Sequence, residues 1–182
     1  YNLSLALLNH GDYLYAKKIS NEGLNYNPND LKLLNNLAAS YFNIGNIDDA
    51  LNIYHRIIKL KCNDHNTLYN LGTCLQRLGD YYEALRYYFK SIKQSPNQPK
   101  VKAKIIFCQR MICDWSTLEL HQKWLNELSE VDNATSPWSL LAMDNDPSKQ
   151  LIRAKNYYQK KYHRKPYHTS IVINEKIRIG YF

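Results

Sequence analysis

Two stretches of this chain repeat one pattern, NNLAASYFNIGNIDDALNIYHRII at residues 35–58 and YNLGTCLQRLGDYYEALRYYFKSI at residues 69–92. Aligned without a gap, they match at a separation of 34 residues. Stepping back by 34 residues continues the match into the first residues of the chain. The matched sets include Leu3, Leu37 and Leu71, then Gly11, Gly45 and Gly79, then Ala16, Ala50 and Ala84. Self-similarity at a fixed period of this length is typical of solenoids built from stacked repeats.

Each matched set predicts a structural role. The large apolar residues recur at helical spacing and predict a buried stripe between paired helices. The glycines should end the first helix of each pair in a left-handed conformation. Asp12, Asn46 and Asp80 follow as N-caps of the second helix, and Glu83 would complete a capping box with Asp80. Small residues mark close approaches of two helices. They are Ser4, Ala38 and Gly72 in first helices, and Ala16, Ala50 and Ala84 in second helices.

This pattern resembles the tetratricopeptide repeat, a 34-residue helix–turn–helix with a Leu-Gly, Gly-x-Tyr, Ala and Pro signature. Residues 1–98 would hold three units, the first incomplete, with Pro28 and Pro96 closing the first and third. Leu34 and Leu68 stand in place of the usual Trp, and Cys62 in place of a Pro. The resemblance implies an all-α, right-handed solenoid of antiparallel helix pairs.

The rest of the chain departs from the repeat. Residues 99–131 read as a capping helix pair, with Cys113-Asp114-Trp115 in place of the turn glycine. Residues 132–174 read as a linker with one helix at about 147–162, opened by an Asp146 N-cap and Pro147. Residues 175–182, EKIRIGYF, alternate apolar and polar residues and predict a single β-strand without a partner.

Composition limits the function classes. The apolar fraction of 45% and charged fraction of 22% fit a soluble globular protein. No apolar run or leader suggests a membrane span or secretion, so we expect a cytoplasmic protein that does not enter membranes. The four cysteines form no CxxC pair, and neither they nor the histidines suggest a metal site. No catalytic constellation or phosphate-binding loop is recognisable.

The net charge of +8 is uneven. Residues 1–146 hold 15 Lys and Arg against 15 Asp and Glu, whereas residues 147–182 hold 9 against one. Because a nucleic-acid footprint normally places a basic stripe along the folded array, nucleic acid is a disfavoured partner.

The inner surface of such a solenoid is the expected binding face. Asn2, Asn36 and Asn70 recur there at the full period, each before the core leucine. An amide donates and accepts, so a column of amides could bind an extended peptide backbone. Alternatively, these side chains simply face water in an Asn-rich chain. Flanking candidates are Tyr69, Thr73 and Arg77, with Tyr1, Asn35 and Phe42.

Four motifs resemble the repeat-to-catalytic junction of O-linked N-acetylglucosamine transferases and their SPINDLY-like relatives. They are Cys113-Asp114-Trp115, the segment SPWSLL at 136–141, Asp146-Pro147, and IRIGYF at 177–182. The resemblance implies that the strand opens a Rossmann-like catalytic lobe and that the intact enzyme uses a UDP-sugar. This chain would recognise the acceptor protein and itself carry no catalytic residue or cofactor.

The alternative is a free-standing adaptor or scaffold with no enzymatic activity. In either case a protein or extended peptide is the expected partner, and an unpaired terminal strand could also pair with a second copy.

Overall fold

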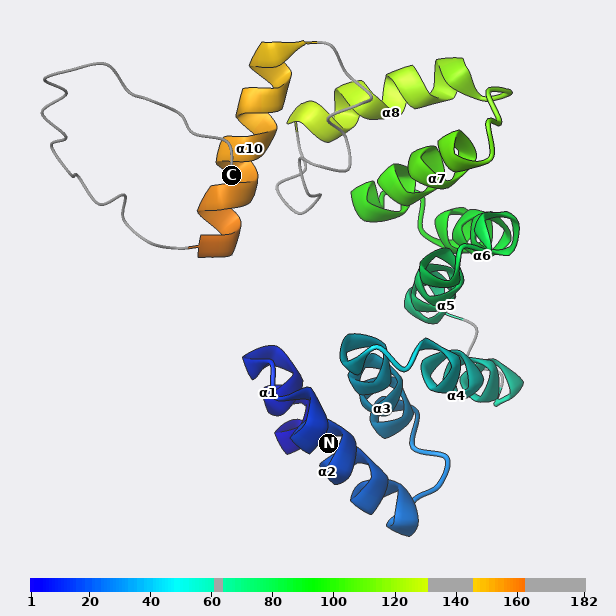
Figure 1. Cartoon of the computed structure of the whole chain (residues 1–182), viewed down its shortest axis with the longest axis vertical. Coiled ribbons are helices and arrows are strands. Elements are labelled where there is room, and N and C mark those ends of the chain that lie inside the picture. Colours follow the sequence, from blue (N-terminus) through cyan, green and yellow to red (C-terminus); the bar gives the residue numbers. More distant parts are fainter. Residues whose placement is uncertain (61–63, 131–145, 163–182) are drawn as a thin grey trace, which may run out of the picture.

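The computed structural model describes residues 1–60, 64–130 and 146–162. In this part of the chain the secondary structure is helical (Figure 1). The first six helices are α1 (Asn2–His10), α2 (Tyr13–Tyr26), α3 (Leu31–Ile44), α4 (Ile47–Lys59), α5 (His65–Leu78) and α6 (Tyr81–Gln94). They are followed by α7 (Pro99–Met111), α8 (Leu118–Glu130) and α10 (Pro147–Tyr162).

The helices pair in chain order and the pairs stack along an arc (Figure 1). The first helices of the pairs, α1, α3, α5 and α7, lie on the inner side of the arc, and α4 and α6 lie on its outer side. A continuous core runs between them, from Leu34 and Ala38 in α3 to Trp124 and Leu125 in α8. The all-α solenoid predicted from the 34-residue period is confirmed.

The turn within each pair depends on a glycine. Gly11, Gly45 and Gly79 adopt φ values of 89°, 100° and 85°, the left-handed region in which a side chain is strained. The Asp12 and Asp80 carboxylates then accept the backbone N–H groups of Tyr15 and Glu83, as predicted for N-caps.

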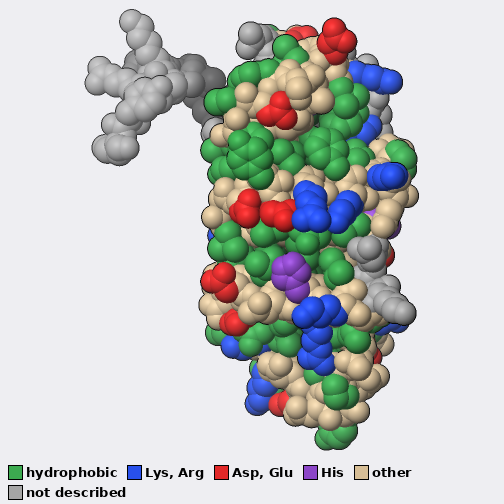
Figure 2. Space-filling view, turned by 90° about the vertical axis from the view of Figure 1, so that its right-hand side faces the viewer, with side chains coloured by type: hydrophobic (Ala, Val, Ile, Leu, Met, Phe, Trp, Pro, Cys, Tyr) green, Lys and Arg blue, Asp and Glu red, His purple; other side chains and the backbone are tan. Residues whose placement is uncertain are grey.

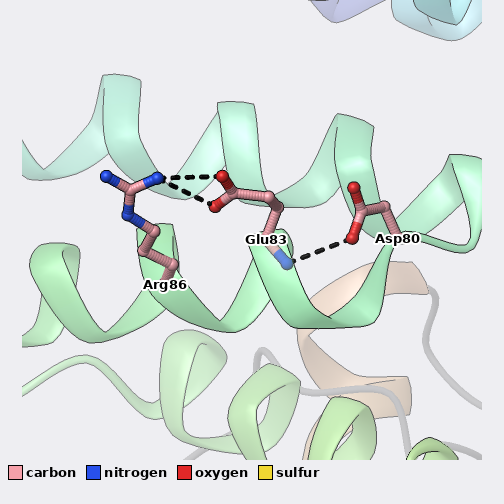
Figure 3. Close-up of polar contacts among 3 residues, drawn as sticks. All are labelled: Asp80, Glu83 and Arg86. Atoms are coloured by element: carbon pink, nitrogen blue, oxygen red, sulfur yellow. Dashed lines mark hydrogen bonds and ion pairs between the residues drawn. The ribbon is translucent and has the colours of Figure 1, made fainter.

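Two details of the predicted capping are wrong. Asn46 occupies the N-cap position of α4, but its side chain makes no capping hydrogen bond. Glu83 turns away from Asp80 and pairs with Arg86 at 2.9 Å, so the capping box is only half formed (Figure 3). The Glu83 carboxylate could accept a hydrogen bond either from the backbone N–H of Asp80 or from the Arg86 guanidinium one helical turn later. The guanidinium is the charged donor and forms the stronger interaction.

The small residues lie where helices approach closely, as predicted. Ser4 and Ala38 in the first helices, and Ala16, Ala50 and Ala84 in the second helices, are fully buried. Gly72 also lies at a close approach, because a Cβ atom there would lie 2.8 Å from Cε1 of Tyr88.

The fourth helix pair keeps the register of the repeat at its turn. The N–H groups of Gly79 and Asp80 donate to the carbonyls of Gln76 and Leu75. The N–H groups of Cys113 and Asp114, 34 residues later, donate to the equivalent carbonyls of Arg110 and Gln109. Cys113 thus occupies the left-handed turn position that glycine holds in the other units, with a φ of 55°. The sequence of residues 99–131 departs from the repeat pattern, but the geometry of the turn in this helix pair is preserved.

Replacing Cys113 with Gly should therefore stabilise the protein. The exposed Cys113 side chain loses little packing, and a non-glycine residue in the left-handed region carries a cost of about 1 kcal/mol. We expect the free energy of unfolding to rise by about 0.5–1 kcal/mol in urea titrations. The control is Cys113→Ala, which keeps the Cβ atom; an equal gain in that variant would contradict the conformational explanation.

The second helix of this unit packs differently from its predecessors. Leu118 stands where Ala84 stands one period earlier, and it is 53% exposed, so α8 does not repeat the close approach of α6. A buried polar network joins α7 and α8 instead. Nε2 of the fully buried His121 lies 2.7 Å from Oε1 of Gln109, whose Nε2 donates to the Asp114 carboxylate. No motif or spacing in the sequence predicts this network.

Helix α10 begins as predicted. The Asp146 carboxylate accepts the backbone N–H groups of Ser148 and Lys149, and Pro147 is the first helical residue. The helix packs against α8, where the buried Arg153 guanidinium donates to the carbonyl of Leu125. The predicted strand at 175–182 and most of the predicted linker at 132–174 lie outside the described residues.

Candidate peptide-binding surface

The helices on the inner side of the arc, α1, α3, α5 and α7, form a surface that we call the inner wall (Figure 1). The Lys32 ammonium of α3 lies 5.0 Å from the ring centroid of Tyr1, next to α1. Likewise the Arg77 guanidinium of α5 lies 5.8 Å from the ring of Phe42 on α3. These cation–π contacts involve three of the sequence-predicted site residues, Tyr1, Phe42 and Arg77.

The asparagine column does not form three equivalent rungs. Asn36 is only 6% exposed, and its Nδ2 donates to the hydroxyl of the buried Ser4 at 2.6 Å. Ser20 of α2 donates to the same hydroxyl at 3.1 Å. Asn36 therefore links α3 to the first helix pair, and this donor is not offered to a ligand as the column hypothesis requires.

The other two asparagines have different surroundings. Asn70 is half-buried beside the hydroxyl group of Tyr54 on α4, whereas Asn2 is exposed. An amide carries four hydrogen-bonding sites, so one neighbouring hydroxyl group leaves Asn70 with capacity for a ligand. The periodic spacing places these residues at equivalent positions, but their neighbours decide whether each amide is accessible.

Asn36→Ala should consequently affect folding more than Asn2→Ala. The substitution leaves the buried Ser4 hydroxyl without one of its partners, which typically costs about 1–2 kcal/mol. Asn2→Ala, at an exposed position of the same column, should change the free energy of unfolding by less than about 0.5 kcal/mol. Urea denaturation of both variants compares them directly. Equal small losses would show that Asn36 has no structural role.

The flanking candidates on α5 are held in place by internal bonds. Thr73 donates to the Tyr69 carbonyl at 2.9 Å, and its hydroxyl oxygen lies 3.3 Å from the hydroxyl of Tyr88. The ring of Tyr69 lies 6.0 Å from that of Tyr88. On α3, Asn35 donates to the Leu31 carbonyl. These side chains are therefore preorganised, which lowers the entropy lost on binding.

Charge is segregated between the two sides of the arc. The inner helices α1, α3, α5 and α7 contain no Asp or Glu within their bounds. Their six basic residues are Lys32, Arg77, Lys100, Lys102, Lys104 and Arg110. The helices α2, α4, α6 and α8 carry both signs, and Figure 2 shows acidic and basic side chains mixed on the outer face. The balanced charge of residues 1–146 thus conceals an excess of basic over acidic residues in the inner helices.

In the described ranges no helix combines the length and hydropathy that a membrane crossing requires. Within the same ranges, His, Cys, Asp and Glu side chains form no group of three or more suited to hold a metal ion.

The fold and the inner wall together define an α-solenoid of stacked helix pairs. Sequence models of the tetratricopeptide repeat match residues 36–60 and 65–98. Tetratricopeptide repeats are thus present, as the sequence pattern predicts. No curated protein matches the chain.

Several solved structures share the fold. MamA from strain MSR-1 superposes with a TM-score of 0.60 at 22% identity, covering 70% of this chain and 74% of that one. MamA from residue 41 onward, from Desulfovibrio magneticus RS-1, gives a TM-score of 0.65 at 22% identity, with 72% and 76% covered. Another MamA crystal structure gives 0.60 at 14% identity, with 88% and 95% covered. At these identities the likeness concerns the fold alone.

Proposed function

We propose that this chain is a protein-interaction module that binds an extended polypeptide segment along its inner wall and serves as an adaptor or scaffold. The observation that supports this most directly is the continuity of the inner wall. The first helices of four successive pairs line this wall (Figure 1), and contacts such as that of Arg77 on α5 with Phe42 on α3 link one helix to the next. A wall of this form offers an extended ligand several subsites in register.

The proposal is tested by placing bulk on the inner wall without adding charge. Ala39 lies on α3 four residues after Asn35 and is half-buried, so Ala39→Tyr should obstruct the wall. Asn52→Tyr, at an exposed position of the outer helix α4, is the matched control.

Peptides selected by display on the immobilised full chain should bind the control normally and bind Ala39→Tyr at least tenfold more weakly. Equal affinities for both variants would place the binding surface elsewhere. Circular dichroism of both variants ensures that weak binding does not come from unfolding.

A glycosyltransferase context is the second proposal, supported by motif order in the sequence. Of the four motifs, Asp146-Pro147 starts a helix as the resemblance implies, while SPWSLL and IRIGYF lie outside the described residues. Neither the family models nor the solved structures reported above concern a glycosyltransferase. This proposal, with UDP-sugar as the donor, requires that a catalytic domain of alternating strands and helices is encoded directly after Phe182. Sequencing the gene tests it. If no such domain is encoded there, the adaptor is the proposal that stands.

Two narrower expectations also remain proposals, a cytoplasmic location and self-association through the terminal segment. Sedimentation velocity over a range of protein concentrations tests the second. A sedimentation coefficient that does not change with concentration would argue against it.

A further inference from the structure

The packing of α8 on α7 includes a histidine that the earlier units lack. His121 on α8 stands where those units carry Ile19, Ile53 and Tyr87, and its side chain is fully buried. An imidazole can change its charge near neutral pH. The groups around its two ring nitrogens therefore decide which charge state this packing accepts.

The hydrogen-bond network assigns the tautomer of this ring. Hydrogen bonds from Ser116 and Gln109 lower the pKa of the Asp114 carboxyl to about 2, so near neutral pH this group only accepts. The Gln109 amide must therefore turn its Nε2 toward Asp114, at 2.8 Å, and its Oε1 toward α8. That oxygen accepts the Thr117 hydroxyl at 3.0 Å and lies 2.7 Å from Nε2 of His121. Because two acceptors would repel each other at this distance, Nε2 carries the hydrogen.

The second ring nitrogen of His121, Nδ1, faces no acceptor. It is buried, and it has no hydrogen-bond partner in the part of the chain that the structure describes. With the hydrogen on Nε2, Nδ1 is the nitrogen that a further proton would occupy. That proton would charge the ring and create a buried N–H group without an acceptor, which is unfavourable. The packing therefore suits the neutral ring.

The charged groups on the elements around His121 are mainly cations. Burial lowers the pKa of the imidazole, and the positive charge of Arg110 on α7 lowers it further, whereas the Asp114 carboxylate in the turn raises it. Lys102 on α7 and Arg153 on α10 add two cations on the elements that contact α8. Among these four groups Asp114 alone is negative.

Packing of His121 is thereby linked to proton uptake. An imidazole whose pKa is lower when packed than when unpacked stabilises the packed state fully above its ordinary pKa of about 6.5. As the pH falls below that value, unpacking takes up a proton and becomes more favourable. Asp114 does not contribute in this range, because the pKa of its carboxyl is about 2.

We infer that His121 makes the junction of α7 and α8 a pH-sensitive contact, which holds α8 in place at neutral pH and releases it on mild acidification. Trp124 and Leu125 on α8 belong to the same core as Ile105 on α7, so release of α8 exposes apolar side chains of both helices. It also frees α10, which packs on α8. The inference goes beyond the proposed function and does not depend on it, because the contact needs no ligand on the inner wall.

Amide hydrogen exchange of the full chain, measured by mass spectrometry at pH 7.5 and pH 5.0, tests this release. After correction for intrinsic exchange rates, the protection of α8 should fall at least about fivefold at the lower pH. In His121→Gln the protection should change by less than about twofold, because the amide keeps a donor for Gln109 and does not titrate. His55→Gln removes an exposed imidazole from α4 and should keep the full fivefold fall.

NMR of the His121 ring in the unchanged protein provides a second measurement, which holds even where His121→Gln does not fold. The nitrogen chemical shifts distinguish the tautomers and should show the hydrogen on Nε2 at pH 7.5. The midpoint of the ring titration should lie below the ordinary imidazole value of about 6.5.

Any of three results would overturn the inference. The first is a ring that carries its hydrogen on Nδ1, or is already charged, at pH 7.5. The second is equal protection of α8 at the two pH values. The third is a loss of protection in His121→Gln as large as in the unchanged protein, which would assign the pH dependence to another group.

Discussion

Tyr88→Ala is expected to lower the free energy of unfolding by about 3–5 kcal/mol, the range found when a large buried aromatic side chain is removed. Tyr88 is fully buried, and its ring packs against Gly72 and Tyr69 of α5. Its hydroxyl donates to Oε1 of Gln76 at 2.8 Å. The truncation opens a cavity between α5 and α6 and removes this bond at once. Urea denaturation monitored by circular dichroism measures the loss.

Two control variants separate these contributions. Tyr88→Phe keeps the ring and removes only the hydroxyl group, so it should cost about 1 kcal/mol. Tyr82→Ala, on the same helix but 73% exposed, should change stability by less than about 0.5 kcal/mol. If Tyr88→Ala costs no more than Tyr82→Ala, the packing of α5 on α6 described above is wrong.

Ala84→Leu is expected to destabilise the protein by about 1–3 kcal/mol, through overpacking. Ala84 is fully buried on α6, and its carbonyl oxygen would lie only 3.2 Å from a Cβ atom placed on Gly72 of α5. The two helices therefore have no room for a larger side chain between them. Thermal and urea unfolding both report the loss.

The fourth helix pair supplies a natural comparison for this variant. Leu118 occupies the equivalent position on α8 and is 53% exposed, so Leu118→Ala should have a small effect. A melting curve of Ala84→Leu that coincides with that of the unchanged protein would contradict the placement of Ala84 between the helices.

Much of the fold could be predicted from the sequence because it depends on backbone geometry. A turn residue in the left-handed region favours glycine, and a close contact between helices requires a small side chain. The residue types of Gly79 and Ala84 therefore predict their structural roles. The start of α10 is equally local, since Asp146 caps it and Pro147 has no N–H to lose.

The surroundings of the site residues could not be predicted in the same way. The 34-residue period places Asn36 on the inner side of α3, but the distance to Ser4 on α1 decides whether its amide is buried. Similarly, the choice of Glu83 between Asp80 and Arg86 depends on side-chain competition that spacing leaves open. Cys113 shows a third case, because its unfavourable φ is imposed by the helices on either side of the turn.

The stacking of helices in chain order has a consequence for how the protein acquires its structure. Extensive packing joins helices that are close neighbours along the chain, so few contacts need a large loop to close first. Chains with such local topology fold rapidly and open unit by unit, beginning at their ends. Amide hydrogen exchange should then be slowest in α5 and α6, which have neighbours on both sides, and faster toward α1.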